Sequence, residues 1–189
     1  MRILIYALPR TGSTALTHYI ANSLHYRAII EPYHDERYWD QTLTEADIWE
    51  RDNVVVKMMF GQGDYWYRDI KSKFDKIVIL YRENIKEQAE SYAYAMNFPD
   101  WHAPYVYNPS IVTEEAYLSA YEKFKDRIEE VRSFNEFTVK YEDLYISGTD
   151  RDRLDEHIGI TNKSFRFMLD SKNKYRRYKR YNFYCRNRI

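Results

Sequence analysis

The sequence of 189 residues is poor in cysteine, glycine and proline, and each scarcity excludes a class of protein. A single thiol, Cys185, cannot form an internal disulfide or a zinc site, so we expect a reducing compartment. Five glycines and five prolines argue against a disordered or repetitive chain. The apolar run at the N-terminus is too short for a signal sequence or a membrane-spanning helix, which predicts a cytoplasmic protein with no membrane contact.

The composition is that of a folded domain, because 44% of the residues are hydrophobic and 31% are charged. We therefore expect one domain over residues 1–189. The formal net charge is zero, but the charge is distributed unevenly. Residues 172–189 carry eight basic side chains and no acidic one, which leaves 21 basic against 29 acidic residues in the remainder.

Hydrophobic periodicity predicts an α/β fold, in which strands alternate with helices along the chain. The predicted strands span residues 2–7, 54–59, 76–81 and 136–141. The predicted helices span residues 13 to about 26, 85–96, 113–134, 150–157 and part of 164–169. This alternation is typical of a three-layer α/β/α domain with a central parallel sheet of four or five strands.

A phosphate-binding loop is predicted at residues 7–14, between the first strand and the first helix. Gly12 and Thr14 match the second glycine and the final Ser/Thr of the G-x-x-x-x-G-K-[ST] motif. Ala7 replaces the first glycine and Ser13 replaces the lysine. Backbone N–H groups and the positive end of the helix still favour a phosphate here, and Arg10 supplies a positive charge. The alternative is an ordinary strand–turn–helix corner.

Two features argue against hydrolysis or transfer of ATP phosphate. The loop lacks its lysine, and the strand at 76–81 continues into Arg82 instead of an acidic residue that would hold Mg²⁺. We therefore expect no metal at this site.

Four segments in order resemble the sulfotransferase family, whose donor is 3′-phosphoadenosine-5′-phosphosulfate (PAPS). The segments are Pro-Arg-Thr-Gly-Ser-Thr at 9–14, Val-Val-Val-Lys-Met-Met at 54–59, Ile-Val-Ile-Leu-Tyr-Arg at 77–82 with the helix to 91, and Phe-Thr-Val-Lys-Tyr-Glu-Asp-Leu at 137–144. The chain is most similar to the bacterial trehalose-sulfotransferase-like branch. The resemblance implies a fold like that of P-loop NTPases, and a sulfuryl transfer that needs no metal.

The resemblance also implies how the donor is bound. The loop residues, namely Pro9, Arg10, Thr11, Gly12, Ser13 and Thr14, correspond to those that bind the 5′-phosphosulfate. Arg82 and Ser91 take the positions that bind the 3′-phosphate, although they are nine residues apart where many family members have eight. Tyr141 matches a residue that contacts the adenine. The alternatives are a strand-end arginine, an ordinary helical serine and a core tyrosine.

Sulfuryl transfer also needs a base for the acceptor proton and positive charge at the leaving phosphate. Arg10 is the candidate for the positive charge, with Lys57 as support. Glu31 is the first candidate for the base, because Glu31-Pro32 resembles the Glu-Pro of the trehalose-type branch. His34 is its competitor, and either could instead be a surface or structural residue.

The acceptor and the basic tail are less determined. Loop aromatics at Trp101, Tyr105 and Tyr107 suit a small-molecule or glycan-like acceptor, or a core beneath a long loop. The tail at 172–189 is interpreted first as a helix packed on the acidic body, second as a lid over PAPS, and third as an arm for nucleic acid. Two other functions stay open: a P-loop nucleotide kinase, and a non-catalytic protein that binds nucleotide or nucleic acid.

Overall fold

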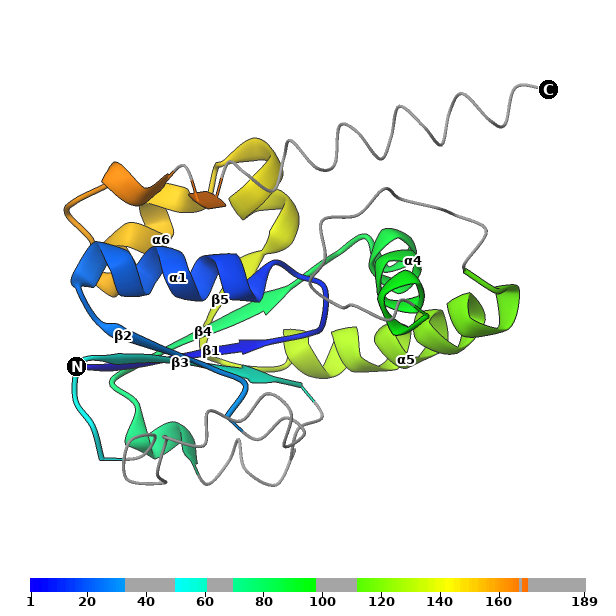
Figure 1. Cartoon of the computed structure of the whole chain (residues 1–189), viewed down its shortest axis with the longest axis horizontal. Helices are drawn as coiled ribbons and strands as arrows, with labels where there is room; N and C mark the ends of the chain where they lie inside the picture. Colours follow the sequence, from blue (N-terminus) through cyan, green and yellow to red (C-terminus); the bar gives the residue numbers. More distant parts are fainter. Residues whose placement is uncertain (33–49, 61–69, 98–111, 167, 170–189) are drawn as a thin grey trace.

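The computed structural model describes residues 1–32, 50–60, 70–97, 112–166, 168 and 169 (Figure 1). One parallel sheet of five strands forms its centre, which confirms the predicted fold class. The strands are β1 (Arg2–Ala7), β2 (Arg27–Ile30), β3 (Val54–Met59), β4 (Lys76–Tyr81) and β5 (Phe137–Lys140), and their order across the sheet is β2-β3-β1-β4-β5.

The central strand, β1, fixes where the functional loops lie. Its last residue, Ala7, pairs with Met59 of β3 on one side and with Leu80 of β4 on the other. The carboxyl ends of the three strands are therefore level, and the segments that follow them meet at one edge of the sheet.

Helices cover both faces of the sheet, as expected for parallel strands (Figure 1). One face packs against α1 (Ser13–Leu24), the π-helix η3 (Glu142–Ser147) and α6 (Arg151–Ile158). The other packs against α4 (Ile85–Met96) and α5 (Glu114–Arg132). Two short 3₁₀ turns complete the described elements, η1 (Lys71–Lys73) and η4 (Ser164–Arg166).

Alternate residues of β1 divide between two hydrophobic cores. Leu4 and Tyr6 face α4 and α5, whereas Ile3 and Ile5 face α1 and η3. All four side chains are buried, and burial of each stabilises the fold by about 1.5–3 kcal/mol. A strand that is apolar on both faces has to lie inside the sheet, which places the loop after β1 between the two helical layers.

The helices differ in how they begin. Thr113 accepts a hydrogen bond from the amide of Ala116 at 3.2 Å and is therefore the N-cap of α5. Asn84 caps α4 in the same way, accepting from the amide of Glu87 at 3.1 Å. By contrast, α1 starts after Gly12 without a side-chain cap. The first amides of α1 are therefore left for another acceptor.

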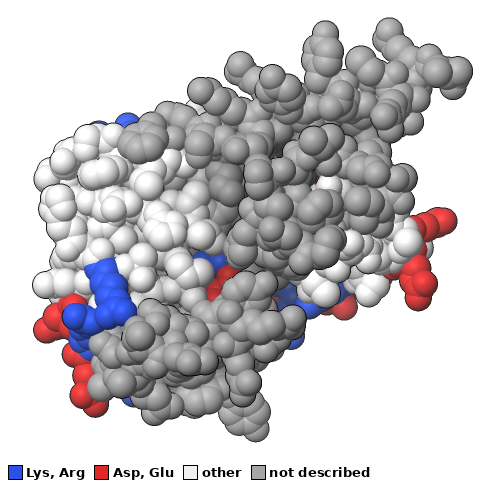
Figure 2. Space-filling view, in the orientation of Figure 1, with Lys and Arg blue, Asp and Glu red and all other residues white. Residues whose placement is uncertain are grey.

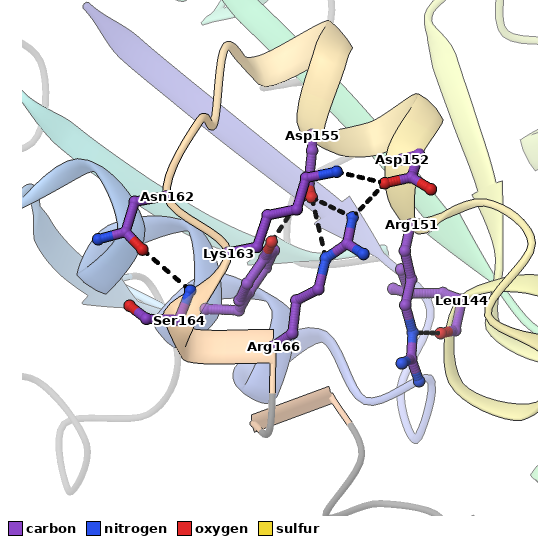
Figure 3. Close-up of polar contacts among 9 residues, drawn as sticks. Leu144, Arg151, Asp152, Asp155, Asn162, Lys163, Ser164 and Arg166 are labelled. Atoms are coloured by element: carbon purple, nitrogen blue, oxygen red, sulfur yellow. Dashed lines mark hydrogen bonds and ion pairs between the residues drawn. The ribbon is translucent and has the colours of Figure 1, made fainter.

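A polar network fixes the middle of α1 to the segment after α6 (Figure 3). The Tyr19 hydroxyl donates to Asp155 at 2.6 Å, and the Arg166 Nε donates to the other carboxylate oxygen of Asp155 at 3.1 Å. Arg166 and Lys163 both bind the exposed carboxylate of Asp152. Burial raises the pKa of Tyr19, and the bond to Asp155 adds to this effect, so its hydroxyl stays a donor.

Four details of the sequence prediction were wrong. The strand β2 was missed, because four residues at a sheet edge carry little periodic signal. The first helix ends at Leu24, since His25 takes a left-handed conformation with φ 57°. The π-helix η3 was not predicted, and β5 is one residue shorter at each end than expected.

The remaining boundaries follow the predictions closely, with α4 at the predicted residues and α6 shifted by one.

In the described part of the chain, no helix is both long and apolar enough to cross a bilayer. Figure 2 shows described basic side chains next to acidic ones along the lower part of the molecule, so charges of both signs alternate on this face.

Candidate functional site

The loop between β1 and α1 has two residues in the left-handed region, Arg10 at φ 64° and Gly12 at φ 79°. Glycine adopts this conformation without strain, whereas arginine does so at a cost. Two side-chain bonds hold the turn. The Thr11 hydroxyl donates to the Leu8 carbonyl at 2.8 Å, and the Gln88 amide of α4 donates to the Pro9 carbonyl at 2.7 Å. A strained arginine backbone held from both sides is typical of a functional loop.

The amino end of α1 offers backbone donors to an anion. Ser13 is the first helical residue and is buried, and Gly12 before it provides no side-chain cap. The positive end of the helix dipole lies at the same place. The Thr11 hydroxyl, by contrast, is turned inward to Leu8, so Thr11 contributes its backbone alone to this concavity.

Lys57 on β3 brings a cation to the loop. Its side chain is 4% exposed, and its Nζ donates to the Thr14 hydroxyl at 3.0 Å and to the Glu31 carboxylate. Glu31 directly follows β2 with φ 48°, and its amide donates to the Lys57 carbonyl at 2.8 Å. The structure thus joins three predicted site residues in one contact group.

Burial lowers the pKa of Lys57, and the neighbouring charge of Arg10 lowers it further, whereas Glu31 opposes the shift. A buried ammonium without its carboxylate would be costly. The carboxylate of Glu31 therefore favours the charged form of Lys57 beside the loop.

Arg10 reaches from the loop to α4, where its Nε donates to the Ser91 hydroxyl at 3.2 Å. Arg10 and Ser91 were assigned to two different ends of a nucleotide. Their contact places the loop and the helix after β4 beside each other, as one site requires.

Arg82, at the end of β4, is buried between two carboxylates. It forms an ion pair with Glu87 of α4, and its Nε lies 3.9 Å from an oxygen of Glu142. Glu142 also accepts the amides of Glu83 at 3.1 Å and Asn84 at 3.2 Å. Within the described residues, the Arg82 Nε has no hydrogen-bond partner. A bound anion would supply the acceptor that this buried donor lacks.

Tyr141 lies beneath Arg82, with the guanidinium carbon 4.6 Å from the ring centroid. This cation–π contact orients the arginine from its other side. The role of Tyr141 at an adenine stays a prediction.

Some predicted site residues lie outside the described residues. They are His34, the aromatic residues at 101, 105 and 107, and the tail at 172–189 with Cys185. The described part of the chain contains no group of three His, Cys, Asp or Glu side chains placed to hold a metal ion.

Sequence reasoning missed Gln88, Glu87, Glu142 and Tyr145, which all contact predicted site residues. Gln88 precedes Ser91 by three residues and therefore shares a helical face with it. Glu142 follows Tyr141 directly. For Gln88 and Glu142, the signal was the spacing from a neighbouring motif residue, whereas the contact of Tyr145 with Gly12 had no local signal.

Comparison with known proteins shows the fold. No protein-family model and no curated protein matches the sequence. A mouse sulfotransferase complexed with 3′-phosphoadenosine-5′-phosphate (PAP) is similar in structure, with a TM-score of 0.52 and 18% identity over 89% of this chain. This chain spans 62% of the length of that sulfotransferase. At this identity the likeness shows a shared fold, of the P-loop-like α/β kind.

Two further structures have lower TM-scores. An unliganded sugar kinase from a Janibacter species has a TM-score of 0.46 and 12% identity, covering 85% of this chain and 95% of its own. The YorR protein of Bacillus subtilis, in complex with phosphorylated GDP, has a TM-score of 0.38 and 14% identity, covering 82% and 96%.

Proposed function

We propose that this protein is a sulfotransferase that moves a sulfuryl group from PAPS to a hydroxyl or amine acceptor. Two cationic positions at the carboxyl edge of the sheet suit a nucleotide with phosphates at both ends. The loop with Arg10 suits the 5′-phosphosulfate, and Arg82 suits the 3′-phosphate. The contact between Arg10 and Ser91 joins the two positions.

The observation that carries the proposal is the contact between Lys57 and Thr14. In P-loop kinases the hydroxyl at the Thr14 position binds Mg²⁺. Here a fixed ammonium already donates to that hydroxyl at 3.0 Å. A built-in cation supports transfer of a sulfuryl group, since this reaction needs positive charge at the bridging oxygen and no metal cradle.

The Nε of Arg82, which has no hydrogen-bond partner among the described residues, supports the second half of the donor site. A guanidinium fork binds phosphate oxygens in pairs, and a 3′-phosphate is what distinguishes PAPS from ATP. Ser91 would bind the same phosphate or keep Arg10 in place, and Tyr141 would contact the adenine.

The chemistry assigns a role to each group near Lys57. The acceptor oxygen or nitrogen forms a bond to sulfur while the bond from sulfur to the bridging oxygen breaks, and PAP leaves. Glu31 takes the acceptor proton, with His34 as the alternative base. Lys57 and Arg10 stabilise the negative charge that develops on the leaving phosphate. The acceptor is a small molecule or glycan, and the reaction takes place in the cytoplasm.

Thermal unfolding with nucleotides tests the proposal. Ligands that bind the folded state raise its unfolding temperature. We expect PAP to stabilise the protein, 5′-AMP to stabilise it less, and ATP with Mg²⁺ to have no effect. Stabilisation by ATP with Mg²⁺ but not by PAP would contradict the proposal and support a kinase. Binding of DNA or RNA alone, with a steep salt dependence, would support a nucleic-acid-binding protein.

A further inference from the structure

The phenol of Tyr145 lies directly behind the phosphate loop. Its hydroxyl donates to the Gly12 carbonyl at 2.6 Å, and the Leu16 amide donates to the same oxygen at 3.2 Å. The ring also packs on the Cα of Gly12, where an added Cβ would lie 2.9 Å from a ring carbon. Gly12 is therefore required for this close approach as well as for its backbone angle.

The two bonds to Gly12 determine where the next amide points. A trans peptide group is planar, and the structure has no cis peptide among its described residues. The carbonyl of Gly12 and the N–H of Ser13 therefore point in opposite directions. The Leu16 amide binds the carbonyl from the body of α1, and Tyr145 adds a second bond to the same oxygen, so the Ser13 N–H faces away from the body of the helix.

Tyr145 also contacts the second cationic position through Tyr141. Tyr145 belongs to η3, Tyr141 is the residue just before η3, and the centroids of their rings are 5.0 Å apart. The guanidinium group of Arg82 lies over the ring of Tyr141. Burial raises the pKa of Tyr145, so its hydroxyl remains protonated and donating at neutral pH. A π-helix of this kind is frequent at functional sites.

We propose that Tyr145 is a positioning residue, whose hydroxyl orients the Ser13 amide toward the 5′-phosphate of the bound nucleotide. This inference rests on the proposed function, since it concerns the same loop. Tyr145 touches no ligand itself and acts through Gly12. Its contact with Tyr141 joins the loop to the arginine that would bind the 3′-phosphate.

The test compares Tyr145→Phe with a matched control, Tyr19→Phe. Tyr19 is equally buried, and its hydroxyl also donates one hydrogen bond of 2.6 Å, to Asp155 instead of the loop. Both variants keep the ring and lose one buried hydrogen bond. The affinities of each for PAP, 5′-AMP and 3′-AMP are measured by calorimetry, well below the unfolding temperature of every variant.

We expect Tyr145→Phe to weaken binding of PAP and 5′-AMP by about tenfold, which is the usual effect of one buried hydrogen bond, and to leave 3′-AMP within about twofold. Tyr19→Phe should leave all three affinities unchanged. Equal losses for 3′-AMP and 5′-AMP, or no difference from Tyr19→Phe, would overturn the positioning role. If the unaltered protein binds neither PAP nor 5′-AMP, the proposed function itself is wrong.

Discussion

The Nζ atom of Lys57 lies 3.0 Å from the hydroxyl oxygen of Thr14, and it also pairs with the carboxylate of Glu31. One buried ammonium therefore connects β3, the loop after β1 and the end of β2. Replacing it tests whether this charge serves the reaction or the fold.

We predict that Lys57→Met lowers kcat for sulfuryl transfer by about 10²–10³-fold, as loss of one group that stabilises transition-state charge does. Affinity for PAP should change much less. Lys76→Met is the matched control, because Lys76 donates from strand β4 to the carbonyl of His157 instead. Steady-state kinetics of both variants measures the difference, and equal kcat values would contradict the prediction.

The pH dependence of the reaction should report Lys57. Its pKa is lowered from 10.5, first by burial, and the charged form is the one that stabilises the leaving group. The rate should therefore fall, as the pH rises, at a lower pH than an ordinary lysine would give. Arginine stays charged throughout this range, so Lys57→Arg should shift the alkaline fall upward. An unchanged alkaline limb in an active Lys57→Arg enzyme would exclude Lys57 as its source.

Glu31→Gln keeps the size of the side chain, removes the group that would accept a proton and takes away the carboxylate that pairs with Lys57. We predict a loss of kcat of about 10²–10⁴-fold with little change in PAP affinity. Glu136→Gln is the control, since Glu136 pairs with Lys71 at the surface at 3.5 Å. A fully active Glu31→Gln would remove Glu31 from the mechanism, and His34→Ala would then be the variant to measure.

Four of the five strands could be predicted, because a buried parallel strand appears in the sequence as an uninterrupted apolar run. Val54 to Val56 and Ile77 to Leu80 are apolar without interruption, and both runs proved to be strands. The motif residues could be placed at strand ends for the same reason. What could not be predicted was long-range pairing: nothing in the sequence around Tyr145 indicates that its hydroxyl meets the Gly12 carbonyl, 133 residues earlier in the chain.

The same limit applies to Arg82. The sequence placed it at the end of β4, but the carboxylates around it come from α4 and η3, and η3 has no periodic signature. A side-chain environment depends on how elements pack, whereas a motif reports one segment. The contact between Glu87 and Arg82 accordingly predicts an effect of Glu87 on nucleotide binding, which the motif alone does not predict.

The ion pairs of Asp152 predict an acid-sensitive contribution to stability. Hydrogen bonds from Lys163 and Arg166 lower its pKa from 3.8 to about 2 (Figure 3). A lowered carboxyl pKa stabilises the fold above 3.8, and this contribution disappears as the pH falls through about 2. Asp152→Asn should therefore destabilise the protein at neutral pH, and this difference should shrink as the pH falls from 3.8 toward about 2, as measured by urea unfolding. Asp126→Asn, an exposed aspartate on α5, is the control for net charge.

Glu87 is predicted to compete with the 3′-phosphate for Arg82. The carboxylate pairs with the Arg82 Nη2 atom, and a phosphate that approaches the guanidinium meets this negative charge. Glu87→Gln keeps an acceptor oxygen and removes the charge, so it should tighten PAP binding several-fold, by about one charged hydrogen bond at most. Binding of 5′-AMP, which lacks the 3′-phosphate, should not change.

Glu90→Gln on the same helix is the control for this prediction, because Glu90 acts electrostatically on Tyr117 and lies one turn further along α4. Calorimetric titration of both variants with PAP and 5′-AMP separates a local effect from one of net charge. If Glu87→Gln weakens PAP, then Glu87 helps to hold Arg82 in its binding position. If PAP and 5′-AMP tighten equally in both variants, Arg82 is not the residue that distinguishes a 3′-phosphate.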